Sequence, residues 1–463
     1  MTTMAKGMCN EAVSAKAVDM ARERDDDRAN ERPSSAVQMD GTLTIPDLFD
    51  LACLDPEILP RATGRQIKAL RGLSFSMKAA LRIALNLEWG TLIVALPAGE
   101  VLRFAGTLEP GAVAAIRIHD QAMAARLLTG GNIGVADAYL DGQWDTPDLT
   151  ALLDLVSRNG MHMRAFIDAR PLVRLAQRAA HSLNRNTKSQ SRKNIEAHYD
   201  LGNDFYETWL DRTMTYSSAV FDHPAQDLAR AQETKYTALL SRLGVTADHH
   251  VLEIGCGWGG FAVHAARTTG ARVTGVTISK AQHDYAQRRV FEAGLADRVT
   301  IAYRDYRDVS GQFDRIASIE MFEAVGEQYW PTFFGKIQSV LTEDGLAGLQ
   351  IISIRDDLYA DYRTSQDFIQ KYIFPGGMLP SPTILDKQLI RAGLTCADKH
   401  LFGLDYARTL AQWRRRFLEA WPAIAAQGFD ERFKRMWLYY YAYCEAGFRS
   451  TATDVGQYVL KRA

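Results

Sequence analysis

One ten-residue run constrains the fold of this chain more than any other segment: residues 251–260 read VLEIGCGWGG. An apolar strand leads here into a glycine-rich turn that opens a helix. Glycines let a ligand approach the backbone closely, and the helix N-terminus offers free N–H groups to it. The run therefore predicts a strand–turn–helix unit that binds a ligand above the carboxyl end of its strand.

Strands and helices alternate regularly around this unit. The strands are expected at 250–254, 272–277, 299–303, 315–319 and 346–354. The helices are expected at 260–268, 281–293, 330–341, 410–421 and 429–448, with a loop at 372–377. This alternation predicts an α/β fold, Rossmann-like and doubly wound around a mostly parallel sheet.

The rest of the chain divides into three further units, because 463 residues exceed one ordinary core of about 100 to 200 residues. Residues 1–45 are polar and mixed in charge, which predicts a disordered tail. Residues 46–180 predict a smaller α+β domain that is structural or presents the substrate. Its strands are expected at 87–96 and 101–104, around a turn at Gly99. Its helices are expected at 122–128, before glycines 130, 131 and 134, and at 148–156.

Residues 181–193 form a basic linker, and 194–463 form the large α/β domain. Seven basic residues gather at and before the linker: Arg170, Arg174, Arg178, Arg185, Lys188, Arg192 and Lys193. Two interpretations stay open, a solvated linker or attraction to anionic lipid headgroups worth about 1 kcal/mol per residue.

Bulk properties exclude several classes of protein. The formal net charge of −1 gives no global attraction for nucleic acid. The five cysteines are scattered, without disulfide or metal-ligand spacing, so we expect a reducing cytoplasmic compartment and no metal site. No stretch approaches the roughly 20 apolar residues that span a bilayer. Any membrane contact is therefore expected to be peripheral.

The cofactor is predicted from residues around the glycine turn of Gly255, Gly257 and Gly259. Glu253 precedes the turn, where a carboxylate can pair with an amino-acid ammonium but would repel a pyrophosphate. The acidic residue that a nicotinamide ribose needs on the next strand is missing from 275–279. Asp305 and Tyr306, after the third strand, suit the amino group and the face of an adenine. These features favour S-adenosyl-L-methionine over a dinucleotide.

Residues 195–463 resemble the cyclopropane-fatty-acyl-phospholipid synthase family, which includes the mycolic acid methyltransferases. The resemblance rests on ordered motifs: HYDLGNDFY at 198–206, YSSAVF at 216–221, the glycine turn, GVTIS at 275–279, MFEAVG at 321–326, IFPGG at 373–377 and Tyr440. The N-terminal domain also resembles that of the longer bacterial members.

The resemblance implies the fold of a class I methyltransferase that acts on cis double bonds of unsaturated phospholipid chains. It implies cofactor contacts from Tyr216, Ser217, Gly255, Thr277, Gln282 and Tyr306. It places Tyr199 and Phe205 where cofactor and acyl chain meet, and Phe322 and Tyr372 are aromatic candidates for the substrate channel. It implies work at the inner face of the membrane and is compatible with a homodimer.

The chain departs from the family at the site of a bicarbonate that acts as base. Glu323 and Tyr440 remain, but Ser218 stands at a cysteine position, Gln350 at a histidine position, and Ala324 replaces a second histidine. Loss of an imidazole weakens the hold on an anion. Either bicarbonate sits on the neutral donors Ser218 and Gln350, or Glu323 itself is the base. We lean to a methyl- or methylene-branched product over a cyclopropane.

Two other functions stay open. A methyltransferase of this type can act on a soluble small molecule, although the extra domain, the basic linker and the aromatic helices argue against it. A lipid-binding protein without catalysis is the alternative of another class.

Overall fold

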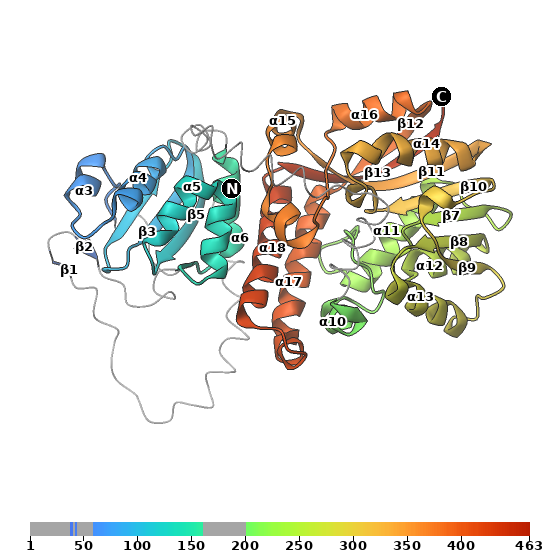
Figure 1. Cartoon of the computed structure of the whole chain (residues 1–463), viewed down its shortest axis with the longest axis horizontal. Coiled ribbons are helices and arrows are strands. Elements are labelled where there is room, and N and C mark those ends of the chain that lie inside the picture. Colours follow the sequence, from blue (N-terminus) through green and yellow to red (C-terminus); the bar gives the residue numbers. More distant parts are fainter. Residues whose placement is uncertain (1–37, 40–41, 44–58, 161–200) are drawn as a thin grey trace, which may run out of the picture.

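The computed structural model describes residues 38–39, 42–43, 59–160 and 201–463, which form two α/β units (Figure 1). The predicted linker 181–193 lies outside the described residues. So does the predicted tail, except for the two short strands β1 (Gln38–Met39) and β2 (Thr42–Leu43).

The larger unit is built on a seven-stranded sheet in the order β12-β13-β11-β10-β7-β8-β9. Its parallel strands are β7 (His250–Ile254), β8 (Arg272–Thr277), β9 (Val299–Tyr303), β10 (Phe313–Ile319) and β11 (Leu341–Ile354). All five predicted strands are confirmed. Two further strands were not predicted: β13 (Thr453–Arg462) pairs antiparallel with β11, and the edge strand β12 (Leu394–Leu401) pairs antiparallel with β13.

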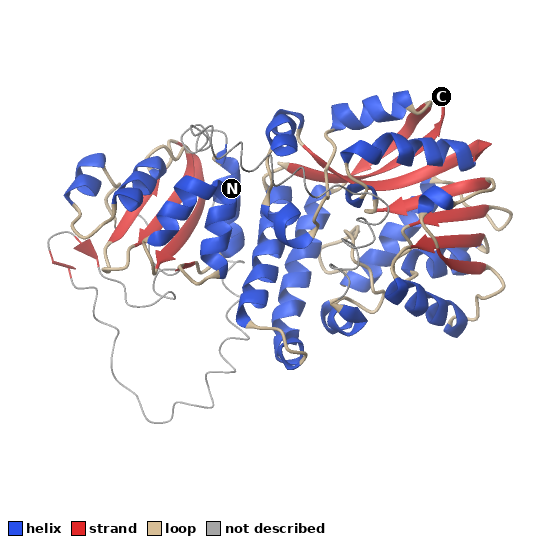
Figure 2. Ribbon diagram, in the orientation of Figure 1, coloured by secondary structure: helices blue, strands red, loops and turns tan. Residues whose placement is uncertain are grey.

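Helices cover both faces of this sheet, as Figure 2 shows. One face packs α11 (Leu228–Arg242), α12 (Gly260–Thr269) and α13 (Lys280–Glu292), and the other packs α14 (Trp330–Val340) and α16 (Pro382–Arg391). Short turns connect them at η2 (Tyr306–Asp308), η3 (Phe322–Ala324) and η4 (Glu327–Tyr329). Apolar helix faces buried on both sides of a parallel sheet explain its near-continuous hydrophobic strands. The doubly wound prediction is confirmed.

Two long helices lie between the two sheets (Figure 1): α17 (Gly403–Ala426) and α18 (Glu431–Arg449). Beside them lie α10 (Gly202–Trp209), α15 (Asp356–Thr364) and the π-helix η5 (Ile369–Ile373). The π-helix occupies part of the segment that was expected to be a loop.

The smaller unit is a four-stranded sheet, in the order β4-β3-β5-β6, with helices packed on it. Its elements are α3 (Gly64–Ala69), α4 (Phe75–Ala84), β3 (Trp89–Ala95), β4 (Val101–Ala105), β5 (Leu108–Ile118), α5 (Ala122–Leu140), β6 (Trp144–Asp145) and α6 (Leu149–Arg158). Glycines 130, 131 and 134 were expected to interrupt the helix that begins at Ala122, and this prediction is confirmed. Non-helical dihedrals at Gly131 (φ 55°, ψ −136°) divide α5 into two helical segments. Glycine absorbs that conformation without a Cβ clash.

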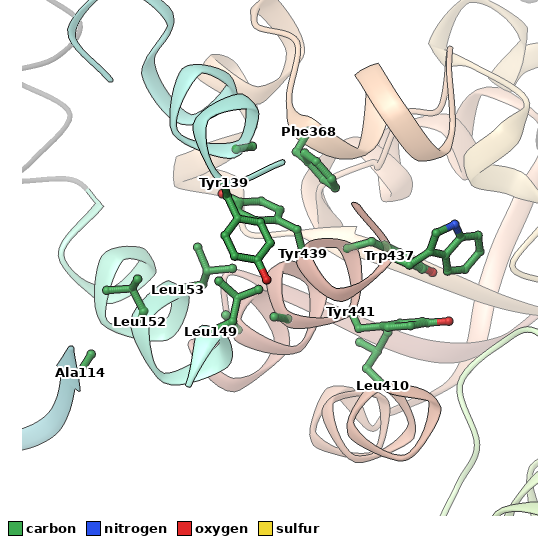
Figure 3. Packing of buried hydrophobic residues seen from close by; sticks show 14 of the residues in the cluster. Ala114, Tyr139, Leu149, Leu152, Leu153, Phe368, Leu410, Trp437, Tyr439 and Tyr441 are labelled. Carbon is green, nitrogen blue, oxygen red and sulfur yellow. The ribbon is translucent and has the colours of Figure 1, made fainter. Parts of the chain in front are cut away.

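The two units are packed against each other through α6 and α18. Tyr439 of α18 contacts Tyr139 of the smaller unit and Phe368 of the larger unit. The ring centroids of these two residues lie 5.6 Å and 4.6 Å from that of Tyr439 (Figure 3). The Thr150 hydroxyl donates to the buried Glu445 carboxylate over 3.1 Å. Of the helices in the described ranges, none combines the length and apolarity needed to cross a membrane.

Candidate active site

A cavity of about 1230 Å³ opens at the carboxyl ends of the parallel strands and extends into the smaller unit. Eleven of the predicted site residues line it: Tyr216, Ser217, Glu253, Gly255, Gly257, Thr277, Gln282, Asp305, Tyr306, Glu323 and Tyr440. This is the edge at which doubly wound sheets bind ligands. The volume exceeds the roughly 300–1,000 Å³ of ordinary small-molecule pockets.

The glycine turn lies against the cavity because its backbone takes left-handed conformations. Gly255 has φ +80° and Gly257 φ +51°. A Cβ at Gly255 would approach Met321 Cγ to 2.6 Å, whereas one at Gly257 would meet no atom within 4 Å. Gly259 lies outside the cavity lining and instead caps α12, where a Cβ would come within 3.0 Å of Ala286. The turn leaves its backbone open to a ligand, as the cofactor prediction requires.

Glu253 provides an acceptor at this turn. Its side chain is buried, and burial raises the pKa of the carboxyl to about 8, while the Lys235 charge opposes the rise. Its Oε2 has no hydrogen-bond partner among the described residues. An unsatisfied buried acceptor at this position fits the ammonium group of S-adenosylmethionine, which would favour the ionised carboxylate.

The next two strand ends carry the remaining cofactor candidates. The Thr277 hydroxyl donates to Gln282 Oε1 over 3.0 Å, which holds both side chains at the end of β8. Asp305 is ion-paired with Arg307 at 2.6 Å, so its carboxylate is already partly satisfied within its own turn. The Tyr306 hydroxyl has no partner among the described residues, and burial raises its pKa to about 12. Tyr306 thus offers both a ring face and a free donor.

Ser218 and Gln350, the predicted neutral anion donors, both bind one carboxylate that sequence reasoning missed. Glu320 Oε1 accepts from the Ser218 backbone N–H and from Gln350 Nε2, each at 2.8 Å. Glu320 Oε2 accepts from the Tyr406 hydroxyl at 2.6 Å. Ser218 and Gln350 are fully buried and lie outside the cavity lining, while Glu320 lines the cavity.

Glu320 is held in an unusual backbone conformation, with φ +51° in the left-handed region. Burial raises the pKa of its carboxyl, while hydrogen bonds from Tyr406 and Gln350 and the charge of Lys235 oppose the rise. A strained non-glycine residue at the end of a strand that faces a cavity is typical of functional sites. A signal was present in the sequence, because Glu320 directly follows the strand 315–319 and Glu253 lies one residue before the end of the strand 250–254.

Lys235 lies close enough to Glu253 and Glu320 for their charges to act on it, and sequence reasoning missed it as well. It is fully buried on α11, and its Nζ donates to Ser217 Oγ over 2.7 Å. Burial lowers its pKa to about 7, while the charges of Glu320, Asp211 and Glu253 act in the opposite direction. It partly offsets the negative charge gathered at this end of the cavity. The sequence of α11 does not distinguish Lys235 from a lysine on an exposed helix face.

Glu323 lines the cavity three residues further on. The Ile352 N–H donates to its Oε1 over 2.6 Å, and its Oε2 has no hydrogen-bond partner among the described residues. Burial and then the charge of Glu320 raise the pKa of this carboxyl to about 8. At neutral pH the protonated form of Glu323 therefore predominates.

Aromatic side chains surround the reacting end of the cavity. The Tyr216 hydroxyl donates to the Tyr440 hydroxyl over 3.0 Å, and both rings line the cavity with Phe374 and Tyr439. The predicted channel residues Phe205 and Phe322 lie elsewhere. Each is almost completely buried in a packed aromatic cluster: Phe205 lies against rings such as Phe429 and Trp437, and Phe322 against rings of α14.

The other predicted aromatics are distributed as follows. Tyr372 lies outside the cavity lining, and its hydroxyl donates to Asp137 in the smaller unit. Tyr199 lies outside the described residues.

Comparison with known proteins places these features in context. Residues 186–458 match the family described as mycolic acid cyclopropane synthetase. Tuberculostearic acid methyltransferase UfaA1 of Mycobacterium tuberculosis is 40% identical over 367 residues, which cover 77% of this chain and 85% of that protein. The cyclopropane-fatty-acyl-phospholipid synthase of Escherichia coli K12 is 38% identical over 367 residues, 79% of this chain and 92% of that protein.

A solved structure gives the same picture for the larger unit. The mycolic acid cyclopropane synthase CmaA1, complexed with SAH and CTAB, is 29% identical with a TM-score of 0.55. The match covers 58% of this chain and 98% of that chain.

Proposed function

Because this chain belongs to the mycolic acid cyclopropane synthetase family and is an S-adenosylmethionine-dependent methyltransferase, we propose that it methylates the cis double bond of unsaturated phospholipid acyl chains. One observation carries the proposal: the cofactor residues and a long apolar space are parts of a single cavity. Relatives that are 38–40% identical to this chain are named for fatty acid and phospholipid substrates. A small polar substrate would leave most of this cavity unfilled.

The glycine turn, Glu253, Thr277, Gln282 and Tyr306 would hold the cofactor, by the contacts described above. S-adenosylmethionine, when bound, supplies an electrophilic methyl group. Methyl addition to one alkene carbon leaves a positive charge on the other carbon. The residues of this chain must then exclude water and stabilise that charge.

Tyr216, Tyr440, Tyr439 and Phe374 suit that task. Their rings line the cavity, and aromatic faces stabilise a desolvated cation by up to about 2 kcal/mol each. The hydrogen bond between Tyr216 and Tyr440 fixes two of the rings relative to each other.

Glu320 is the base that the geometry favours. Its carboxylate accepts from Ser218, Gln350 and Tyr406, which are donors of the kind that a bound bicarbonate would need. Burial raises the pKa of both carboxyls, but hydrogen bonds from Tyr406, Gln350 and Ser218 favour the ionised form of Glu320, whereas at Glu323 backbone N–H groups oppose the rise and the charge of Glu320 adds to it. We therefore place Glu320 in the role of the family's bicarbonate, in preference to Glu323.

A fixed carboxylate is consistent with a branched product. A hydride shift moves the positive charge to the carbon that carries the new methyl group. Loss of a proton from that methyl to Glu320 then leaves a methylene branch, which a later reduction converts to a methyl branch. Loss of the proton with ring closure before the hydride shift gives a cyclopropane instead, which is the alternative product.

The place of action is part of the proposal. A substrate that is a membrane lipid requires peripheral binding at the bilayer, and we place the protein at the cytoplasmic face. The basic residues 170–193 that suggested headgroup attraction lie outside the described residues, and a homodimer stays a prediction.

Expression in a bacterial host that lacks such enzymes tests the function. Gas chromatography with mass spectrometry of the membrane fatty acids should show new species one carbon heavier than the host's monounsaturated acids. A host that makes the Gly255→Ala variant at the same level is the control. An unchanged profile in cells with folded wild-type protein would contradict the proposed function.

A further inference from the structure

Among residues 59–160, which the structure describes, the core of the smaller unit contains an unfilled space. In a unit of this size, the helices α4, α5 and α6 should close on the sheet and fill the space between them. Instead, apolar side chains from these helices and from β3 and β5 line the far part of the active-site cavity. We call this part the N-terminal lobe; representative lining residues are Leu81, Ala84, Leu92, Ile116, Leu152 and Val156.

Unfilled apolar space is costly to a fold. Residual cavities in cores lower stability by about 24 cal/mol for each Å³. A space of this kind is too apolar to hold ordered water, and such cavities bind apolar molecules. The lobe therefore fits a ligand that completes the core of the smaller unit.

The lobe is continuous with the reacting end of the cavity. Small residues line the passage where α6 meets α18: Ser157, Gly160, Gly447 and Ser450. Ser157 and Ser450 hydroxyls are 2.8 Å apart, so they satisfy each other and need no polar ligand. Beyond the passage, Tyr439 and Tyr440 lead to the cofactor residues. Figure 3 shows Leu152 and Leu153 of α6 on the side of Tyr439 that belongs to the smaller unit.

The kink in α5 enlarges the lobe. Gly130 and Gly131 both line the cavity, and a Cβ added at Gly130 would meet no atom within 4 Å. The non-helical dihedrals at Gly131 interrupt the helix at this point. Larger residues at either position would fill space or straighten the helix, so the two glycines account for both the kink and the opening.

The lobe offers no unpaired charged side chain to a ligand among the described residues. Among the described residues 59–160 that line the cavity, the charged side chain is Arg158. Its guanidinium is bound to Asp154 at 3.1 Å, donates to the Arg449 carbonyl and stacks 4.7 Å above the Trp89 ring. These partners satisfy it within the protein. The lining is therefore suited to a plain alkyl chain.

We propose that the N-terminal lobe binds an alkyl chain of the lipid substrate while a double bond lies at the cofactor end. The lobe residues, 77–156, lie outside the 186–458 segment that matches the family. Either the distal part of the reacting chain or the second chain of the same lipid can supply this alkyl group. The proposal rests on the proposed function, since it assumes a lipid at the cofactor end.

Two variants fill the lobe from different helices: Ala84→Phe on α4 and Gly130→Phe on α5. The matched control is Ala125→Phe, on an exposed position of α5 outside the lining. Purified full-length proteins are compared for cofactor binding, thermal unfolding and kcat/KM on dioleoyl phospholipid vesicles and on oleoyl lysophospholipid micelles. Excluding a chain segment should lower kcat/KM about tenfold or more, since one methylene group alone is worth about that much.

The outcomes separate the two sources. If the second chain occupies the lobe, the filled variants lose activity on the two-chain lipid and keep it on the one-chain lipid. If the distal part of the reacting chain occupies it, they lose activity on both, and a shorter unsaturated chain restores it. Wild-type kinetics on both lipids in folded, cofactor-binding variants would overturn the proposal. Absence of wild-type turnover would count against the proposed function instead.

Quenching of tryptophan fluorescence tests the proposal even if Ala84→Phe and Gly130→Phe do not fold. Trp89 and Trp144 line the lobe. Phospholipid with dibrominated chains should quench wild-type tryptophan fluorescence, and the Trp89→Phe variant should lose part of that quenching. Identical fractional quenching in wild type and variant would show that no chain reaches the lobe.

Discussion

The cofactor end and the N-terminal lobe are parts of one cavity, but they are built in opposite ways. At the cofactor end, buried ionisable groups from strand ends, a short turn and α11 lie together: Glu253, Glu320, Glu323 and Lys235. In the lobe, three helices and a sheet leave an apolar space whose charged residue is fully paired. The two proposals account for the difference. Methyl transfer would create a cation at the cofactor end, and an alkyl chain in the lobe would need only apolar surroundings.

The largest effect on activity is expected from substitution of Glu320, a buried carboxyl of a kind that the apolar lobe lacks. Glu320→Gln removes the ionisable oxygen and should lower kcat by about 10²- to 10⁴-fold, the usual contribution of a general base. Cofactor affinity should stay unchanged, because Glu320 is placed at the reacting carbon rather than at the cofactor. Turnover with labelled S-adenosylmethionine and calorimetric titration give the two values.

Glu327→Gln is the matched control, because Glu327 is ion-paired with Arg363 at the surface. A folded Glu320→Gln variant with wild-type kcat, alongside an inactive Glu323→Gln variant, would assign the base to Glu323.

The second effect is on the pH dependence of stability. The pKa of Glu323 is about 8 in the folded protein and ordinarily 4.5, so between these values the folded state holds a proton that the unfolded state releases. Stability contributed by this group is therefore lost as pH rises, by up to about 1.4 kcal/mol per pH unit. Urea unfolding from pH 5 to about pH 8 should show a shallower decline for Glu323→Gln than for wild type. Parallel profiles would contradict the burial of an unpaired carboxyl here.

The third effect concerns the glycine turn. Gly255→Ala places a Cβ 2.6 Å from Met321 Cγ in a left-handed conformation. Strain of about 1–3 kcal/mol should weaken cofactor binding by roughly 5- to 150-fold. Gly294→Ala is the control, since Gly294 also has positive φ (+67°) but its added Cβ meets no atom within 4 Å. Both variants should lose stability, and calorimetry should find weaker cofactor binding only for Gly255→Ala.

The smallest effect is at the contact that joins the two regions. Glu445 is fully buried on α18, accepts from Thr150 of the smaller unit and is ion-paired with Arg414 and Arg449. Glu445→Gln should lower the free energy of unfolding by about 1–3 kcal/mol. Calorimetry should also show the two units unfolding less cooperatively.

The exposed Glu419→Gln, on α17, should change stability by less than about 0.5 kcal/mol. Equal, small effects of the two substitutions would show that Glu445 does not join the regions.

The sequence predicted the cofactor end well because its signals are local. The run from Val251 to Gly260 is contiguous, and strand periodicity located five strands that the structure confirms. The antiparallel strands β12 and β13 were missed because their partners lie far apart along the chain. Lys235 was missed for the same reason, since its importance depends on carboxylates from other strands.

The N-terminal lobe was not predicted at all. Its side chains are those of an ordinary core, and residue type does not tell whether packed helices leave a space between them. The glycines at 130 and 131 were expected to interrupt a helix, and Gly131 does so, but the sequence did not show that this kink opens a lobe. The channel residues Phe205 and Phe322 show the reverse error: aromatic residues expected to face a substrate fill the core instead.

The most direct measurement of the central claim is the product made by the purified wild-type protein in bicarbonate-free buffer. Dioleoyl phospholipid and S-adenosylmethionine with a fully deuterated methyl group are the substrates, and mass spectrometry counts the deuterons while proton NMR identifies the carbon skeleton. If the Glu320 carboxylate replaces a bound anion, turnover proceeds without bicarbonate, and the product is a methylene-branched chain that retains two deuterons. A cyclopropane product whose formation requires added bicarbonate would contradict the account.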